Sequence, residues 1–163
     1  MAIDRRGSEA GVRALRADDL ERMISIDEAH TGRSRRRFFV KRLRAAEQAA
    51  DDFVHLGVDA GGTLAGFALV RVLRGEFGRD QPVAVLDVID VDRSQQERGC
   101  GRRLLEGLAA QLRQRGVNRL YTEAEWTNHA LLKFFAASGF ELARRVILER
   151  RVAEPLVEAV EGL

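Results

Sequence analysis

Residues 83–112 constrain the fold of this chain more than any other stretch. They read VAVLDVIDVDRSQQERGCGRRLLEGLAAQL. An apolar run at 83–91 leads through a polar turn containing Gly99 and Gly101 into a helical pattern with its leucines on one face. The stretch therefore predicts a buried strand that passes through a glycine turn directly into an amphipathic helix.

The glycine turn and the start of the predicted helix have the chemistry of an anion-binding site. N–H groups in the first turn of a helix have no intrahelical partner, and the helix dipole adds partial positive charge there. Glycines let a phosphate approach these groups closely. The alternative is an ordinary turn that needs glycine only for flexibility. The residues that we assign to the ligand are Gln96, Arg98, Gly99, Cys100, Gly101, Arg102 and Arg103.

Two motifs identify a family. Neither of the common phosphate-binding motifs, G-x-G-x-x-G and G-x-x-x-x-G-K-(S/T), occurs in the chain. Residues 96–101 instead resemble the (Q/R)-x-x-G-x-(G/A) signature of the GNAT superfamily of acetyl-CoA-dependent N-acetyltransferases. Residues 128–140, NHALLKFFAASGF, are similar to that family's N-x-x-A-x-x-(L/F)-Y-x-x-x-G-F phrase. The resemblance covers nearly the whole chain and implies acetyl-CoA as the cosubstrate.

The composition is typical of a soluble globular protein. The chain has 163 residues, of which 45% are apolar and 32% charged, so we expect one domain over 1–163 with flexible ends at 1–10 and 155–163. It contains no apolar run that predicts a membrane span or a signal peptide, so we expect a cytoplasmic location and no membrane partner. One cysteine and three histidines show no metal-ligand spacing, and no metal is expected.

The hydrophobic pattern predicts an α/β (α+β) chain in the order β-α-α-β-β-β-α-β-α-β. A short strand near Val12 and two helices come first, and the helix before the final strand ends near Ser138. The strands expected after the two helices are residues 53–59, 63–73, 83–91, 117–124 and 141–151. A helical crossover joins parallel strands. This order matches the GNAT fold, a mixed, mostly antiparallel sheet with a parallel central strand pair.

Acetyl transfer to an amine needs a proton acceptor, because an alkyl ammonium with a pKa of about 10.4 must lose its proton before it attacks. Glu123 is the first candidate, since the resemblance to protein N-terminal acetyltransferases places a glutamate there. Its alternative is a strand end that faces solvent. Asp87 is the second, because the resemblance implies bases at two positions of the central strand, which match Val85 and Asp87 here. A carboxylate among apolar strand residues is expensive to bury without partners. Its alternative is a structural ion pair.

The resemblance also implies contacts between the central strand and the cofactor. The backbone of Ile89, Asp90 and Val91 is expected to bond the pantetheine arm, with an N–H there that holds the thioester oxygen. Simple alternation places the side chain of Asp90 on the face of Leu86 and Val88. The family carries a bulge in this strand, and a bulge would reverse that parity.

Phe135 stands where the family usually has a tyrosine that acts as the general acid. Phenylalanine cannot protonate the leaving thiolate, and the loss of a general acid costs roughly 10²–10⁴-fold in rate. A thiol with a pKa near about 8.5 is nonetheless a tolerable leaving group. Water or Tyr121, which shares a strand face with Glu123, are the alternatives. Asn128 is expected either to contact the cofactor or to cap a helix.

These features predict an enzyme that transfers an acetyl group from acetyl-CoA to a primary amine of a protein N-terminus or a small molecule by direct attack on the thioester. The alternative is a catalytically weak GNAT-fold module that binds acyl-CoA as a sensor. The arginines of 31–37 are interpreted as a solvated helix start, so no nucleic-acid partner is expected. An exposed last strand would allow a homodimer. Residue types alone do not identify the acceptor amine.

Overall fold

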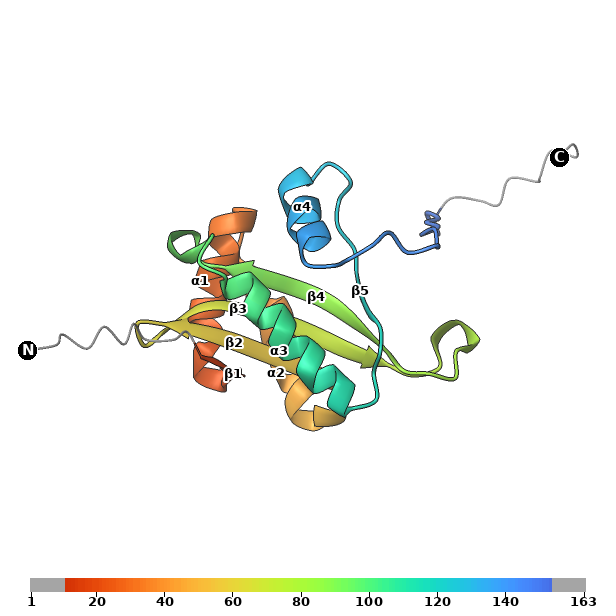
Figure 1. Cartoon of the computed structure of the whole chain (residues 1–163), viewed down its shortest axis with the longest axis horizontal. Coiled ribbons are helices and arrows are strands. Elements are labelled where there is room, and N and C mark those ends of the chain that lie inside the picture. The colour runs from red at the N-terminus through yellow and green to blue at the C-terminus, as the bar shows by residue number, and fades with distance from the viewer. Residues whose placement is uncertain (1–10, 154–163) are drawn as a thin grey trace, which may run out of the picture.

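The computed structural model describes residues 11–153 as a five-stranded sheet with helices against both faces (Figure 1). The strands are β1 (Val12–Ala14), β2 (Phe53–Ala60), β3 (Thr63–Leu73), β4 (Val83–Val91) and β5 (Leu120–Thr122). The helices are α1 (Leu20–Thr31), α2 (Arg36–Gln48), α3 (Cys100–Gln114) and α4 (His129–Ala137). The order of elements is the predicted one as far as α4.

The sheet is mixed, as predicted. Its strands lie in the order β1-β2-β3-β4-β5, with antiparallel pairing up to β4 and parallel pairing between β4 and β5. The predicted hairpin between β2 and β3 is confirmed. Gly61 and Gly62 form its turn with φ angles of 61° and 80°, which glycine adopts without the steric penalty of a side chain.

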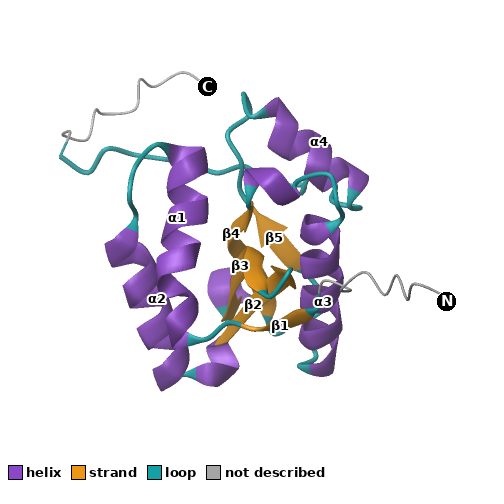
Figure 2. Ribbon diagram, turned by 90° about the vertical axis from the view of Figure 1, so that its left-hand side faces the viewer, coloured by secondary structure: helices purple, strands orange, loops and turns teal. Residues whose placement is uncertain are grey.

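Helices cover the two faces of the sheet unequally, as Figure 2 shows. Helices α1 and α2 lie against one face, α3 lies against the other, and α4 lies near the end of β4 and β5. The predicted leucine face of α3 is buried in the core beneath it. On the opposite face Met23 and Phe39 pack against Phe67 and Leu69. Two hydrophobic clusters therefore hold the sheet between them.

A bulge at Asp87 changes which way β4 presents its side chains. Leu69 pairs with Val88 and Val70 with Leu86, so Asp87 has no opposite residue in β3. Leu86 packs in the cluster beneath α3, whereas Val88 packs in the cluster beneath α1 and α2. Because the bulge reverses the alternation, residues beyond it occupy the opposite face from the one that simple period-two counting predicts.

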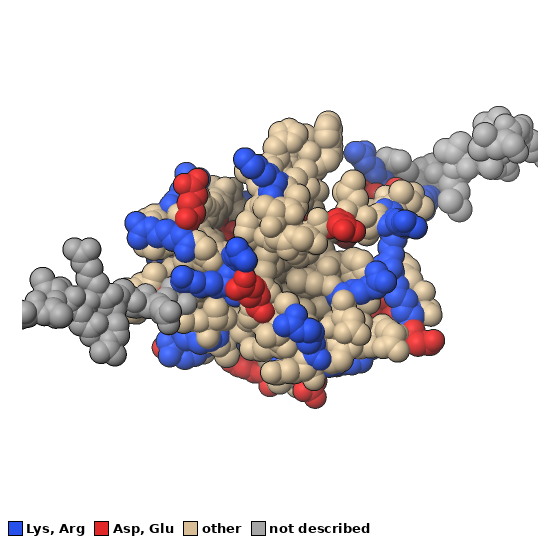
Figure 3. Space-filling view, in the orientation of Figure 1, with Lys and Arg blue, Asp and Glu red and all other residues tan. Residues whose placement is uncertain are grey.

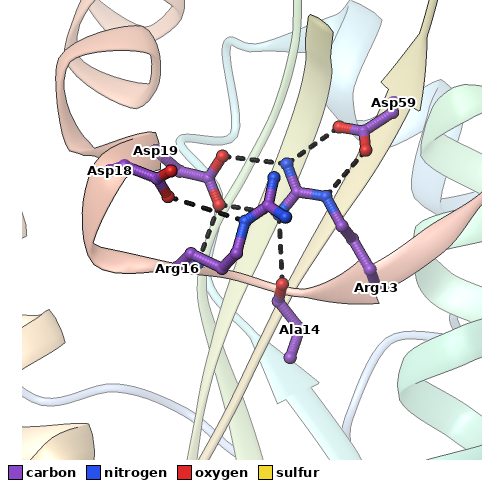
Figure 4. A network of polar contacts seen from close by, with 6 residues as sticks. All are labelled: Arg13, Ala14, Arg16, Asp18, Asp19 and Asp59. Carbon is purple, nitrogen blue, oxygen red and sulfur yellow. Dashed lines mark hydrogen bonds and ion pairs between the residues drawn. The ribbon is translucent and has the colours of Figure 1, made fainter. Parts of the chain in front are cut away.

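A single guanidinium connects the first strand to two other elements (Figure 4). Arg13 of β1 donates to both carboxylate oxygens of Asp59 at 2.7 and 2.9 Å and to both of Asp19 at 2.7 and 2.8 Å. Asp19 is buried and directly precedes α1, and Asp59 lies beside the β2–β3 turn. The Arg13 hydrogen bonds lower the pKa of the Asp19 carboxyl. This planar group thereby fixes the start of α1 against the sheet.

The predicted last strand, 141–151, is wrong. These residues form no strand, and their apolar side chains are exposed, with Leu142 and Leu148 at 96% and 89%. A strand needs a partner of comparable length, and β5 is three residues long rather than the predicted eight. The apolar residues Val146, Ile147 and Leu148 are also consecutive and do not alternate. Residues 141–151 therefore have no neighbouring strand of sufficient length to pair with, and their apolar side chains have no apolar surface to pack against.

The expected flexible ends, 1–10 and 155–163, lie outside the described residues. Within residues 11–153 no helix is both long enough and apolar enough to cross a bilayer.

Candidate functional site

Strands β4 and β5 separate beyond a short parallel stretch, and a cavity of about 140 Å³ lies where they part. The pairing ends at Leu86 and Thr122, so the rest of β4 has no strand neighbour on that side. The lining comes from four parts of the chain and includes three carboxylates. The residues are Arg35, Leu86, Asp87, Val88, Ile89, Asp90, Thr122, Glu123, Leu131 and Phe135.

A larger hollow of about 420 Å³ lies elsewhere, between the start of β2 and the end of β3. Its lining includes Asp52, Phe53 and Arg74. None of the residues predicted to bind the cofactor or to act in catalysis lines it, whereas Asp87, Ile89, Asp90 and Glu123 line the smaller cavity. We therefore assign the candidate site to the cavity between β4 and β5.

Asp87 lies in the cavity wall and is paired with two arginines. Arg71 of β3 donates to both of its carboxylate oxygens at 2.8 Å, and Arg42 of α2 lies 3.1 Å from Oδ2. The Asp87 side chain is 11% exposed. His55 lies in the same cluster with neither ring nitrogen bonded, and burial lowers its pKa to about 4. These contacts give Asp87 the surroundings of a structural ion pair, and its catalytic role stays a prediction.

Asp90 has different surroundings. Its carboxyl faces that of Asp27, a side chain of α1 that is 0% exposed. Within residues 11–153, Asp90 Oδ2 is buried and accepts no hydrogen bond. Burial raises the pKa of Asp90 to about 6, and so does Asp27, first because the protonated Asp90 can share a hydrogen bond with it and then through its charge. The bulge places Asp90 on the same face as Val88, beneath α1 and α2, and not on that of Leu86.

Arg35 closes the site from the side of the two helices. It immediately precedes α2, and its guanidinium makes a bidentate ion pair with Asp27, with Nε 2.9 Å from Oδ2. Its guanidinium carbon also lies 5.3 Å from the centre of the Phe38 ring. His30, at the end of α1, lies 2.7 Å through Nε2 from the carbonyl oxygen of Val91. The end of β4 is thus joined to α1 by both side-chain and backbone contacts.

Glu123 lies one residue beyond β5 and is exposed, although it lines the cavity. Across from it, Phe135 of α4 is 5% exposed and packs on Phe140, with ring centres 4.8 Å apart. Tyr121 does not line the cavity. Its hydroxyl is buried without a hydrogen-bond partner, and its ring lies under the guanidinium of Arg145.

The predicted anion-binding turn lies at the start of α3. Gly99 has a φ of 79°. The first hydrogen bond of the helix runs from the N–H of Arg103 to the carbonyl oxygen of Gly99 at 3.0 Å. The N–H groups of residues 100–102 therefore have no acceptor within the helix. No acidic residue occupies the first turn. The side chains of Gln96, Arg98, Arg102 and Arg103 are exposed, while Cys100 is buried in the core. These groups fit a diphosphate.

Gly101 also has a packing role. A Cβ atom there would lie 3.0 Å from the Phe134 ring, so glycine lets α4 approach the start of α3. Asn128 caps α4, because its Oδ1 accepts from the N–H of Leu131 at 3.2 Å. Its predicted contact with the cofactor stays a prediction.

Figure 3 shows the face of the molecule that carries α3. Basic and acidic side chains are interspersed over it, and the region of α4 is mostly uncharged. Within the described residues there is no cluster of three or more histidine, cysteine or acidic side chains that could hold a metal ion.

Sequence analysis did not identify Asp27 and Arg35 as site residues. A signal for Asp27 existed, because it lies four residues after Met23 and three after Ile24, both on the buried face of α1. An acidic residue at an apolar position of a helix needs a partner. Arg35 belongs to the arginine run at 31–37 that is interpreted as a solvated helix start. Arg36 does fit that interpretation, since it pairs with the exposed Glu21.

Comparison with known proteins identifies relatives. The model of the Acetyltransferase (GNAT) family matches residues 15–140. Ribosomal protein bS18-alanine N-acetyltransferase of Escherichia coli (strain K12) is 32% identical over 98 residues, which cover 60% of this chain and 62% of that enzyme. N-alpha-acetyltransferase 80 of Mus musculus is 43% identical over 68 residues, 41% of this chain and 20% of that protein. The matched part therefore spans less than two thirds of either relative.

Solved structures share the fold. An aminoglycoside N-acetyltransferase AAC(6')-Iy in complex with CoA superposes with a TM-score of 0.78 at 24% identity, covering 93% of this chain and 100% of that one. A transcriptional regulator from Bacillus halodurans C-125 gives a TM-score of 0.76 at 14% identity over 88% of this chain and 100% of that one.

Proposed function

Because this chain belongs to the acetyltransferase (GNAT) family, we propose that it transfers an acetyl group from acetyl-CoA to a primary amine. One observation carries the proposal: β4 and β5 part over a cavity that contains carboxylates, next to a helix whose first turn offers free N–H groups and arginines. A cofactor diphosphate at α3 would direct the pantetheine arm toward the gap between the strands.

Acetyl-CoA supplies the activated acyl group, and the chain's own residues would bind and orient it. The N–H groups of Cys100, Gly101 and Arg102 would donate to the diphosphate oxygens, and Arg98 and Arg103 would neutralise its charge. The unpaired edge of β4 at 89–91 would hydrogen-bond the pantetheine arm. Buried apolar groups such as Leu86 and Phe135 would exclude water from the thioester.

The acceptor enters as an ammonium ion, and the cavity suits a cation. Glu123, which is exposed, and Asp90, which is half-buried, both line it. Glu123 is therefore placed to attract the amine and remains a candidate proton acceptor. The names of the two sequence relatives favour a protein α-amino group as acceptor, while the aminoglycoside enzyme with the same fold favours a small polyamine as the second candidate.

A direct assay tests the proposal. The full chain is incubated with acetyl-CoA and a panel of acceptors, namely peptides with free N-termini, peptides with blocked N-termini and one lysine, and aminoglycosides. We expect thiol release and one added acetyl group by mass spectrometry on the free N-terminal peptides. A chain that binds acetyl-CoA by calorimetry but acetylates no amine would support the alternative, an acyl-CoA-binding module, and would overturn the enzyme proposal.

The cofactor site has its own control. Reversing charge with Arg98→Glu and Arg103→Glu together should weaken acetyl-CoA binding about 100-fold or more, since each charge-assisted contact to phosphate is worth about 1.5–3 kcal/mol. Arg37 is an exposed arginine on α2, and Arg37→Glu should leave the affinity within about twofold. Equal effects of the two changes would remove α3 from the cofactor site.

A further inference from the structure

We propose that Asp90, held beside Asp27 by the Arg35–Asp27 ion pair, is the carboxylate that takes the proton from the acceptor ammonium. The inference rests on the proposed acetyltransferase function and names the residue that serves it. Three features place Asp90 in this role: its position on the cavity wall, its free oxygen and the charges around it.

The geometry distinguishes Asp90 from the other carboxylates of the cavity. Asp87 has both oxygens bonded to Arg71 and a third contact to Arg42. Asp90 lines the same cavity, and within the described residues its Oδ2 accepts no hydrogen bond. A buried carboxylate oxygen without a donor is costly, and uptake of a proton relieves this cost.

The charges around Asp90 come from every element packed against it. On α1 these are Asp27 and His30, and before α2 there is Arg35. The residue opposite Asp90 in β3 is the apolar Phe67. Arg35 is bonded to Asp27, so its charge is largely matched there, and Asp90 faces a carboxylate in a buried setting. These neighbours raise the pKa of Asp90 to about 6, close to the neutral value at which a general base works best.

The proton balance of the reaction is complete with this group. The ammonium R–NH₃⁺ gives one proton to the Asp90 carboxylate and becomes R–NH₂. The nitrogen lone pair forms the C–N bond at the thioester carbonyl, and the C–S bond then breaks with its electron pair on sulfur. The second nitrogen proton neutralises the thiolate as CoA–SH, and Asp90 releases its proton to solvent.

Glu123 is the rival for this role. It lies beyond the end of β5 and is exposed, although it lines the same cavity. A solvated carboxylate is held in place less firmly than a buried one, so it is a poorer proton acceptor for a bound ammonium. We expect Glu123 to help to attract the cation, and Asp90 to determine how kcat/KM depends on pH.

The decisive experiment tests isosteric variants with two acceptors. One is an ammonium ion at the assay pH, and the other is already neutral. Asp90→Asn should lower kcat/KM roughly 10²–10⁴-fold for an alkyl amine and abolish the rise of log kcat/KM through about pH 6. Acetyl-CoA affinity should stay within about twofold. An acceptor that is already neutral at the assay pH, such as a hydrazide, should be acetylated by Asp90→Asn nearly as fast as by the wild type.

Two further variants serve as references. Glu123→Gln should change kcat/KM less than about tenfold and keep the pH profile. Asp80→Asn, an exposed carboxylate in the β3–β4 loop, should match the wild type within about twofold. The assignment of Asp90 is overturned if Asp90→Asn slows acetylation of the alkyl amine and of the neutral acceptor equally. It is also overturned if Glu123→Gln alone removes the rise of log kcat/KM through about pH 6.

A measurement without turnover separates this inference from the function itself. Titration of the side-chain carboxyl ¹³C signals in the free protein should show Asp90 with a midpoint near about pH 6, and Asp27→Asn should lower that midpoint. An ordinary carboxyl midpoint for Asp90 would overturn the inference even in an active enzyme. A protein with the expected midpoint that acetylates no amine would overturn the proposed function, and with it the catalytic use of the pair.

Discussion

Asp87 and Asp90 lie three residues apart on β4 and line the same cavity, yet their closest charged partners differ. Asp87 contacts two guanidiniums, those of Arg71 and Arg42. Asp90 faces the carboxylate of Asp27 and keeps one oxygen unbonded. The contrast shows that one short strand provides both a group that stabilises the fold and a group that is kept reactive.

The difference comes from the elements that cover each residue. Asp87 is the bulge residue and lies between an arginine of β3 and one of α2. Asp90 lies further along, beneath the end of α1, where Asp27 is the acidic residue on an otherwise apolar helix face. Residue type alone did not separate the two roles, because both are aspartates in an apolar strand. Their partners do.

The largest expected effect is on stability at Asp87. Asp87→Asn leaves two partly buried guanidiniums without an anion and should lower the free energy of unfolding by about 2–4 kcal/mol. Urea denaturation at neutral pH measures this, with Asp80→Asn as the control that should change it by less than about 0.5 kcal/mol. An unchanged midpoint for Asp87→Asn would remove the ion pair from the list of stabilising contacts.

Asp90→Asn should change stability in the opposite direction and raise the free energy of unfolding at neutral pH. The folded state raises the pKa of Asp90 to about 6, above its unfolded value, so the native protein binds this proton more tightly and loses stability as the pH rises toward 6. Above that pH the charged form costs on the order of 3 kcal/mol, which the amide removes. Asp90→Asn should therefore stabilise the fold at neutral pH and not below about pH 4. A loss of stability at neutral pH would contradict this account.

Asp92, the next acidic residue along the chain, should show the smallest effect. Bonds from the hydroxyl and N–H of Ser94, and then the contact with Arg22, lower its pKa to about 2. Its contribution is present above the unfolded value and is lost as the pH falls toward 2. Asp92→Asn should cost about 1 kcal/mol at neutral pH, since the amide can still accept from Ser94. A difference that stays constant down to pH 2 would rule out the ionic part of this contribution.

Much of the fold followed from local patterns. The β2–β3 hairpin, the whole of β4 and the leucine face of α3 have periodicities that are carried by nearby residues. The parallel pairing of β4 with β5 followed from the helix between them. The family motif also pointed to the start of α3, where the structure has free N–H groups and arginines.

Features set by distant residues could not be predicted. The last strand failed because β5 is too short to pair with residues 141–151, and strand length at an edge depends on the whole sheet. The Asp27–Asp90 contact joins α1 to β4 across more than sixty residues of chain. Spacing in the sequence shows that Asp27 lies on the buried side of its helix, but not which strand residue it meets.

The bulge at Asp87 also makes the length of β4 a functional constraint. Deleting Asp87 would leave Val88 and Asp90 on their present face, whereas deleting a paired residue beyond the bulge, such as Ile89, would turn Asp90 toward the leucines of α3. The carboxylate would then enter a hydrocarbon interior with no guanidinium nearby, and the cluster beneath α3 would lose the apolar contact of Ile89. In this family member, insertions and deletions in β4 should thus be far less tolerated than substitutions, because the register determines which face of the sheet each side chain occupies.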